Sequence, residues 1–166
     1  DLYADAVAKK IDGAYERLCH ATSLLGERDE ALQCCAAALA FMPSNAFLLT
    51  LDGQESLAAG LVERAAASYS HAAKLTPGDA DALVNAGIAL TAAGRPKEAV
   101  ERLRASLALS PQSVAAYTEL GRALEANRGD RGAADAACEA RKHASLLAPK
   151  SAALKLDYGN ALLSAQ

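Results

Sequence analysis

Three prolines of this chain, Pro43, Pro77 and Pro111, are separated by a fixed interval of 34 residues. A glycine lies 17 residues before each proline and an alanine lies 12 residues before it, at Gly26, Gly60, Gly94, Ala31, Ala65 and Ala99. A fixed period of roughly 20–50 residues is the signature of stacked supersecondary units. Because each such unit buries its apolar face against its neighbours, the period constrains the chain to a repeat architecture.

Each repeat contains two segments in which apolar and small residues recur at i, i+3, i+4 and i+7, which is the helical period. In the second repeat, for example, Leu48, Leu49 and Leu57 are followed by Ala65, Ala66 and Tyr69. No segment alternates with the period of a strand, so we expect an all-α chain of antiparallel helix pairs. One domain over 1–166 is expected, with repeats at about 12–45, 46–79, 80–113 and 114–151 and a half repeat at 152–166.

The residues between these segments are typical of helix ends. Gly60 and Gly94 stand where the chain leaves one helix and turns into the next, a turn that favours positive φ. Ser44 is expected to cap the helix after Pro43, and Asp79 or Asp81 the helix after Pro77. The prolines at the 34-residue interval end the second helix of each pair.

Two features depart from the period. Pro149 follows Pro111 by 38 residues, and we place the four extra residues in the breaker-rich turn 127–132. That register puts Arg141 where the other repeats hold a large apolar side chain. Asp52 occupies a position held by Leu18, Ala86 and Leu120 elsewhere, so we expect its carboxylate to be partly solvated or hydrogen-bonded.

Composition and charge exclude several classes of function. The net charge of −3 argues against nucleic acid as a partner, because phosphate binding needs a basic patch. Apolar stretches fall far short of the roughly 20 residues that span a bilayer, and no signal peptide opens the chain, so we expect a cytoplasmic protein without a membrane partner. The cysteines Cys19, Cys34, Cys35 and Cys138 are expected to be buried thiols, and adjacent Cys34 and Cys35 do not pair with each other.

No sequence pattern indicates catalysis. Phosphate-binding glycine loops, zinc-protease motifs and nucleophile elbows are absent from the sequence. The histidines His20, His71 and His143 fall at unrelated helical positions, and neighbours such as Cys19 and His20 diverge by about 100° on a helix. We therefore expect no catalytic residues, no metal site and no cofactor.

The repeating positions resemble those of the tetratricopeptide repeat family. The resemblance rests on one series of five residues, Gly53, Gly60, Ala65, Ala72 and Pro77, and on its repetition at Gly87, Gly94, Ala99, Ser106 and Pro111. It implies a right-handed superhelical solenoid in which the first helix of each pair lines a concave groove. The groove residues that it implies are Phe47, Thr50, Leu51, Gln54, Val84, Asn85, Ile88, Thr118, Glu119 and Arg122.

The resemblance also implies a function, that of a non-catalytic scaffold or adaptor. Its partner would be a protein, bound as an extended peptide or a helix in a mixed polar and apolar groove. Packing between repeats is the alternative role for Phe47, Leu51 and Ile88. Carboxylate clamping of the kind seen in tetratricopeptide co-chaperones is not expected, because Asn85 lacks lysine neighbours and Glu119 replaces an arginine. The alternative function is an assembly element that self-associates through its terminal helices.

Overall fold

The structure is a computed structural model that describes residues 2–127 and 132–164. Within those residues every regular element is an α-helix and no strand occurs, which confirms the predicted class. The helices group into two compact units, Asp1–Thr76 and Pro77–Gln166, and each is described by itself. The expectation that 1–166 forms one domain stays a prediction.

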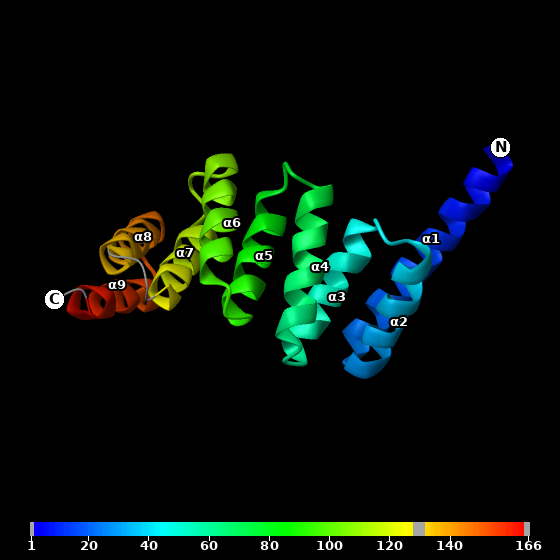
Figure 1. The fold of residues 1–166 in the computed structure, drawn as a ribbon, viewed down its shortest axis with the longest axis horizontal. Coiled ribbons are helices and arrows are strands. Elements are labelled where there is room, and N and C mark those ends of the chain that lie inside the picture. Colours follow the sequence, from blue (N-terminus) through cyan, green and yellow to red (C-terminus); the bar gives the residue numbers. More distant parts are fainter. Residues whose placement is uncertain (1, 128–131, 165–166) are drawn as a thin grey trace. The chain divides into compact units, whose positions relative to one another are not determined.

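The first unit consists of two helix pairs, α1 with α2 and α3 with α4 (Figure 1). The helix bounds are Leu2–Leu25 for α1, Arg28–Phe41 for α2, Ala46–Ala58 for α3 and Val62–Leu75 for α4. Each helix packs on the next, and α1 also contacts α3. A cluster of buried side chains from α1, α2 and α3 holds the first three helices together, formed by Cys19, Cys35, Ala38, Leu48 and Leu51.

The second unit repeats this arrangement with two pairs and a final helix (Figure 1). The bounds are Ala80–Ala92 for α5, Pro96–Leu109 for α6, Val114–Ala126 for α7, Ala133–Leu147 for α8 and Ala152–Ser164 for α9. Consecutive helices again pack on each other, and α5 contacts α7. In both units, therefore, the first helices of adjacent pairs are neighbours. We call α1, α3, α5, α7 and α9 the inner helices.

The turns and caps follow the sequence with one exception. Gly26, Gly60 and Gly94 have φ of 80°, 75° and 70°, which confirms that these turns need a residue tolerant of positive φ. Asp79 caps α5 by accepting hydrogen bonds from the backbone N–H groups of residues 81 and 82. Ser44 was wrong as the cap of α3, because the Asn45 side chain accepts the hydrogen bond from the Leu48 N–H instead.

A glycine on three inner helices lets the second helix of the same pair approach closely. A Cβ on Gly87 would lie 2.6 Å from Cγ of Leu103, and one on Gly53 would lie 2.7 Å from the Tyr69 ring. Real Cβ atoms do not come so close, so the sequence interval between these residues encodes the packing of each pair. In the fourth pair, a Cβ on Gly121 would lie 3.0 Å from Cγ of Arg141.

The Arg141 contact locates the four extra residues of the fourth pair. Arg141 takes the place of Leu103, with its aliphatic stem against Gly121 and its guanidinium bonded to Glu125 Oε2 at 2.6 Å. Residues 127–132 separate α7 from α8, whereas only 93–95 separate α5 from α6. Three extra residues therefore lie between the helices and one lengthens α8, as the predicted turn required; residues 128–131 of that turn lie outside the described residues.

Candidate functional site

The inner helices of the first unit present a mixed aromatic and polar surface. Phe47 on α3 is 45% exposed, and its ring meets the exposed His20 ring of α1 edge-on, with the ring centroids 5.8 Å apart. Asn45 Nδ2 donates a hydrogen bond to Glu16 Oε1 at 2.7 Å, also between the two helices. Gln54, two turns after Phe47 on α3, is exposed. Two adjacent inner helices thus contribute to one surface.

Two further candidates on α3 do not offer free groups to a ligand. Leu51 is 5% exposed and belongs to the buried cluster with Cys19, Cys35 and Leu48. The Thr50 hydroxyl donates to the Ala46 carbonyl at 2.8 Å, within its own helix. Of the four candidates on α3, therefore, Phe47 and Gln54 form the open surface.

On α5 the candidates divide in the same way. Val84 is 5% exposed and lies in the core, whereas Asn85 and Ile88 are half-buried at the helix surface. Asp81, one turn before Asn85, is exposed. An amide and a branched apolar side chain therefore lie one turn apart, beside the neighbouring inner helix α7.

On α7 the polar candidates bond within their own helix. Arg122 Nη1 lies 2.9 Å from Glu119 Oε1, and the Thr118 hydroxyl donates to the Val114 carbonyl at 2.9 Å. Arg122 is exposed, while the Glu119 side chain is 17% exposed. This paired charge supplies one donor group and one acceptor group beside Asn85 and Ile88 of α5.

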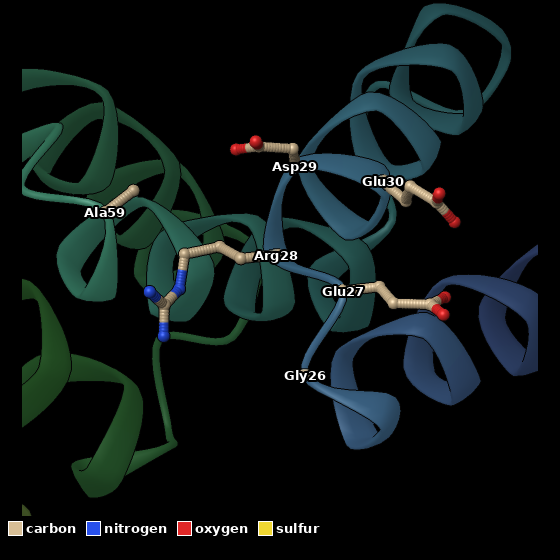
Figure 2. A pocket seen from close by; sticks show the side chains of 6 residues that line it. All are labelled: Gly26, Glu27, Arg28, Asp29, Glu30 and Ala59. Carbon is tan, nitrogen blue, oxygen red and sulfur yellow. The ribbon is translucent and has the colours of Figure 1, made fainter.

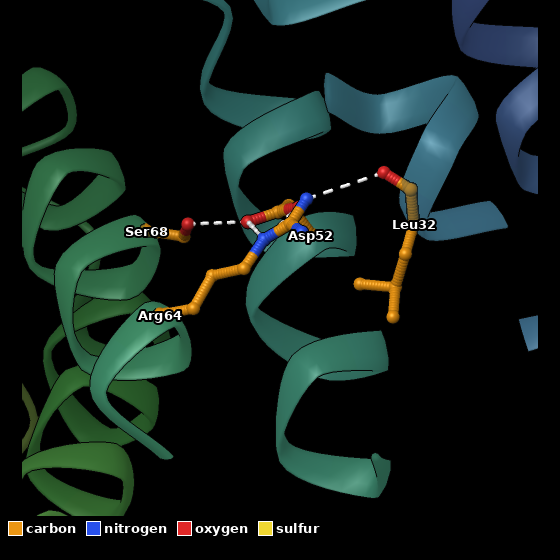
Figure 3. Close-up of polar contacts among 4 residues, drawn as sticks. All are labelled: Leu32, Asp52, Arg64 and Ser68. Carbon is orange, nitrogen blue, oxygen red and sulfur yellow. Dashed lines mark hydrogen bonds and ion pairs between the residues drawn. The ribbon is translucent and has the colours of Figure 1, made fainter. Parts of the chain in front are cut away.

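Asp52, the unusual carboxylate of α3, is buried and fully partnered. Its side chain is 3% exposed and bonds to Arg64 and Ser68 of α4, with Arg64 Nε 3.1 Å from Asp52 Oδ1 (Figure 3). Arg64 Nη2 also donates to the Leu32 carbonyl of α2 at 3.2 Å. This confirms that Asp52 is hydrogen-bonded, and it assigns the carboxylate to holding helices together rather than to chemistry.

The expectation of four free thiols was wrong for two of the cysteines. Cys19 on α1 and Cys34 on α2 form a disulfide with their Cα atoms 5.4 Å apart. Helical periodicity alone missed the pair, because their 15-residue separation spans a turn whose path sets the distance. Cys35 and Cys138 are free and buried, as predicted, and burial together with the nearby Asp52 charge raises the pKa of Cys35 to about 12.

A surface depression of about 560 Å³ lies at the start of α2 and contains none of the predicted residues. It is lined by Gly26, Glu27, Arg28, Asp29, Glu30 and Ala59. Figure 2 shows Arg28 and Asp29 extending on the side of Ala59, while Glu27 and Glu30 point away from it. All six residues are exposed, so the depression is open rather than an enclosed ligand cavity.

The structure was also searched for metal sites and membrane spans. In the part of the chain that it describes, no three or more His, Cys, Asp or Glu side chains gather where a metal ion could be held. Over the same residues, no helix has both the length and the apolar character needed to cross a bilayer.

Comparison with known proteins supports the repeat assignment. Residues 56–124 match the family model described as tetratricopeptide repeat. A MamA RS-1 double mutant is 21% identical with a TM-score of 0.81, and the similarity covers 93% of this chain and 85% of that one. MamA 41-end from Desulfovibrio magneticus RS-1 is 22% identical, with a TM-score of 0.80 and coverages of 92% and 84%.

A third solved structure shows the same fold over a shorter length. The TPR domain of Arabidopsis OM64 is 19% identical, with a TM-score of 0.62, covering 70% of this chain and 93% of that domain. At these identities the likeness shows a shared fold of paired helices. No curated protein sequence matches the chain.

Proposed function

We propose, since this chain is a tetratricopeptide-repeat protein, that it binds a partner protein on the exposed faces of its inner helices. The tetratricopeptide fold is a known protein–protein interaction module, and generally a non-catalytic one. The bound segment is an extended peptide or a single helix, and the chain acts as a scaffold or adaptor. The observation that carries the proposal is the exposed Phe47 beside His20.

Phe47 has the properties of an anchor for a partner. Aromatic side chains are enriched among the residues that dominate binding energy, because they bury a large area at little entropic cost. The neighbours of Phe47 along α3, Leu48 and Leu49, are buried, so the helix that presents it is held in place. A surface that is already ordered loses little entropy on binding.

The second unit offers a complementary set of groups. Ile88 supplies apolar contact, and the amide of Asn85 can donate to and accept from a peptide backbone. Gln54 on α3 has the same capacity in the first unit. Amides near apolar side chains suit a peptide whose backbone is bound by hydrogen bonds and whose alternate side chains are bound by contact. Leu51 and Val84 are left out of the proposed surface because they are buried.

The test is selection of a random peptide library displayed on phage against the immobilised chain. Affinities of the enriched peptides are then measured for the wild type, for Phe47→Ala, for Ile88→Ala and for the double variant. We expect the double variant to bind at least tenfold more weakly, because a truncated anchor typically costs about 2 kcal/mol. The two single variants report on the two units separately.

His71→Ala is the matched control, because His71 is exposed on α4 and lies outside the proposed surface. We expect this variant to bind the peptides as the wild type does. Circular dichroism establishes that each variant keeps its helices. Unchanged affinity in the double variant would reject the inner-helix faces as the contact surface.

A further inference from the structure

Helix α1 has a second exposed face, opposite the side that packs on its own unit. On the packed side, Cys19 is fully buried and the Ser23 hydroxyl donates to Glu55 of α3 at 2.6 Å. On the other side, Ala14, Leu18, Ala21 and Leu25 are all exposed, with Leu18 at 55% and Leu25 at 73%. These four residues follow each other at intervals of four, three and four, so they form one apolar stripe along the helix.

The later inner helices cover the equivalent positions. Thirty-four residues after Leu18 comes Asp52, and 34 more bring Ala86, then Leu120; all three are at most 8% exposed. The equivalents of Ala14 are Leu48, Ala82 and Ala116, which are also buried, and Leu48 packs in one cluster with Cys35 and Ala38 of α2. A helix therefore covers this position in α3, while the same face of α1 is open.

The stripe is also longer than one repeat requires. Helix α1 has 24 residues, whereas α3, α5 and α7 have 13 each. In the sequence the alternating three and four spacing occupies seven successive positions, all apolar: Ala4, Val7, Ile11, Ala14, Leu18, Ala21 and Leu25. Apolar a and d positions sustained over about three heptads are the pattern of a coiled-coil seam.

The flanking residues distinguish between two orientations of a second α1. With Leu18 and Leu25 at a positions, Lys10 and Arg17 stand at g, and Ala8, Tyr15 and Thr22 stand at e. A parallel pair sets g of one helix beside e of the other, which here opposes a cation to an uncharged residue. An antiparallel pair sets g against g, which opposes cation to cation and is unfavourable. The stripe is therefore self-complementary in the parallel orientation.

The fold leaves room for such a pair. Successive residues turn by about 100° around a helix, so the packed side of α1, around Cys19, lies roughly a third of a turn from the stripe. A two-fold axis along the stripe then puts the repeats of the two copies on opposite sides of the paired helices. We propose that two copies of this chain dimerise through α1 as a parallel coiled coil, with Leu18 and Leu25 meeting the same residues of the second copy.

Sedimentation equilibrium of the whole chain tests the dimer. We expect the wild type to be dimeric at 100 micromolar and Leu18→Glu to weaken the dimer at least tenfold, since a carboxylate would enter the seam ~. Leu163→Glu on α9 is the matched control, because Leu163 is 74% exposed and lies outside the stripe. A monomeric wild type, or a loss of dimer with Leu163→Glu equal to that with Leu18→Glu, would overturn the proposal.

Cysteine cross-linking tests the orientation and does not depend on Leu18→Glu folding. In a parallel pair, Leu25→Cys places two thiols across the seam, and glutathione disulfide is expected to oxidise them to a covalent dimer. Leu24→Cys is equally exposed, at 75% for the native leucine, but stands at g and is expected to cross-link far more slowly. Equal rates for the two variants would overturn the parallel seam. Peptide affinity in Leu18→Glu is expected to stay unchanged, which separates this surface from the inner-helix faces.

Discussion

Arg64 on α4 pairs with both carboxylate oxygens of Asp52 on α3, and the same guanidinium reaches the Leu32 carbonyl of α2 (Figure 3). One side chain thus ties three helices of the first unit together. The two partners differ in burial, since the Arg64 side chain is 39% exposed and that of Asp52 is 3% exposed. Removing either one should therefore have a different cost.

Arg64→Ala is expected to lower the free energy of unfolding by about 3 kcal/mol, because it leaves a buried carboxylate without its cation. Asp52→Ala is expected to cost less, about 1 kcal/mol, since the half-exposed guanidinium can reach water. Urea unfolding followed by circular dichroism measures both. Arg122→Ala, which removes an exposed pair with Glu119, is the control and should change stability by less than about 0.5 kcal/mol. Equal losses for Arg64→Ala and Arg122→Ala would contradict the assignment.

Gly87→Ala is expected to destabilise the second unit by about 1–3 kcal/mol, because its Cβ would lie 2.6 Å from Leu103 Cγ and must displace that side chain. Gly159→Ala on α9 is the matched control, because its Cβ would meet nothing within 4 Å. Alanine is the better helix former by about 1 kcal/mol, so the control should be neutral or stabilising. Thermal unfolding of both variants gives the comparison, and a neutral Gly87→Ala would show that the pair does not need its close approach.

Cys35 is expected to resist iodoacetamide at pH 8.5 in the folded protein and to react in urea. Its side chain is fully buried and its pKa is raised from 9.0 to about 12, so the reactive thiolate is scarce. Because the folded state holds this proton more tightly, the stability it contributes is complete below pH 9 and is lost between pH 9 and 12. Mass spectrometry of the Cys35 peptide measures the labelling. Labelling in the folded state as fast as that of an exposed Leu25→Cys thiol would disprove the burial.

The Cys19–Cys34 disulfide is expected to stabilise the α1–α2 pair, because closing a 15-residue loop in the unfolded chain contributes about 3 kcal/mol. Dithiothreitol should therefore lower the melting temperature of the wild type. The control is Cys34→Ser, whose melting temperature should be lower at the outset and insensitive to the reductant. Peptide mapping without reductant should find the two cysteines linked, and free thiols at both positions would refute the bond.

The spacing of the glycines and prolines predicted the repeats because these residues act locally. Gly60 and Gly94 adopt the positive φ that their turns require, and the 16-residue step from Gly87 to Leu103 repeats the step from Gly53 to Tyr69. Even the fourth pair, with Arg141 in place of an apolar residue, follows the same register. A contact that every unit repeats leaves a period in the sequence.

The candidate surface was only partly predictable. Helical spacing placed Phe47, Leu51 and Gln54 on one face of α3, yet Leu51 is 5% exposed while Phe47 is 45% exposed. A side chain at the edge of a face is covered or open according to the neighbouring helix, and one helix's periodicity does not describe that neighbour. The same reason explains the Cys19–Cys34 bond, whose Cα separation of 5.4 Å depends on how α1 and α2 meet.

The sequence by itself therefore determined the helical class, the register of the pairs and the glycine contacts, because each of these recurs at a constant interval along the chain. Only the tertiary structure decided which side chains are singular: that Arg64 neutralises Asp52, that Cys19 bonds Cys34, and that Leu18 is open where Ala86 and Leu120 are covered. These depend on groups brought together from different helices, and a contact made once leaves no repeating pattern in the sequence.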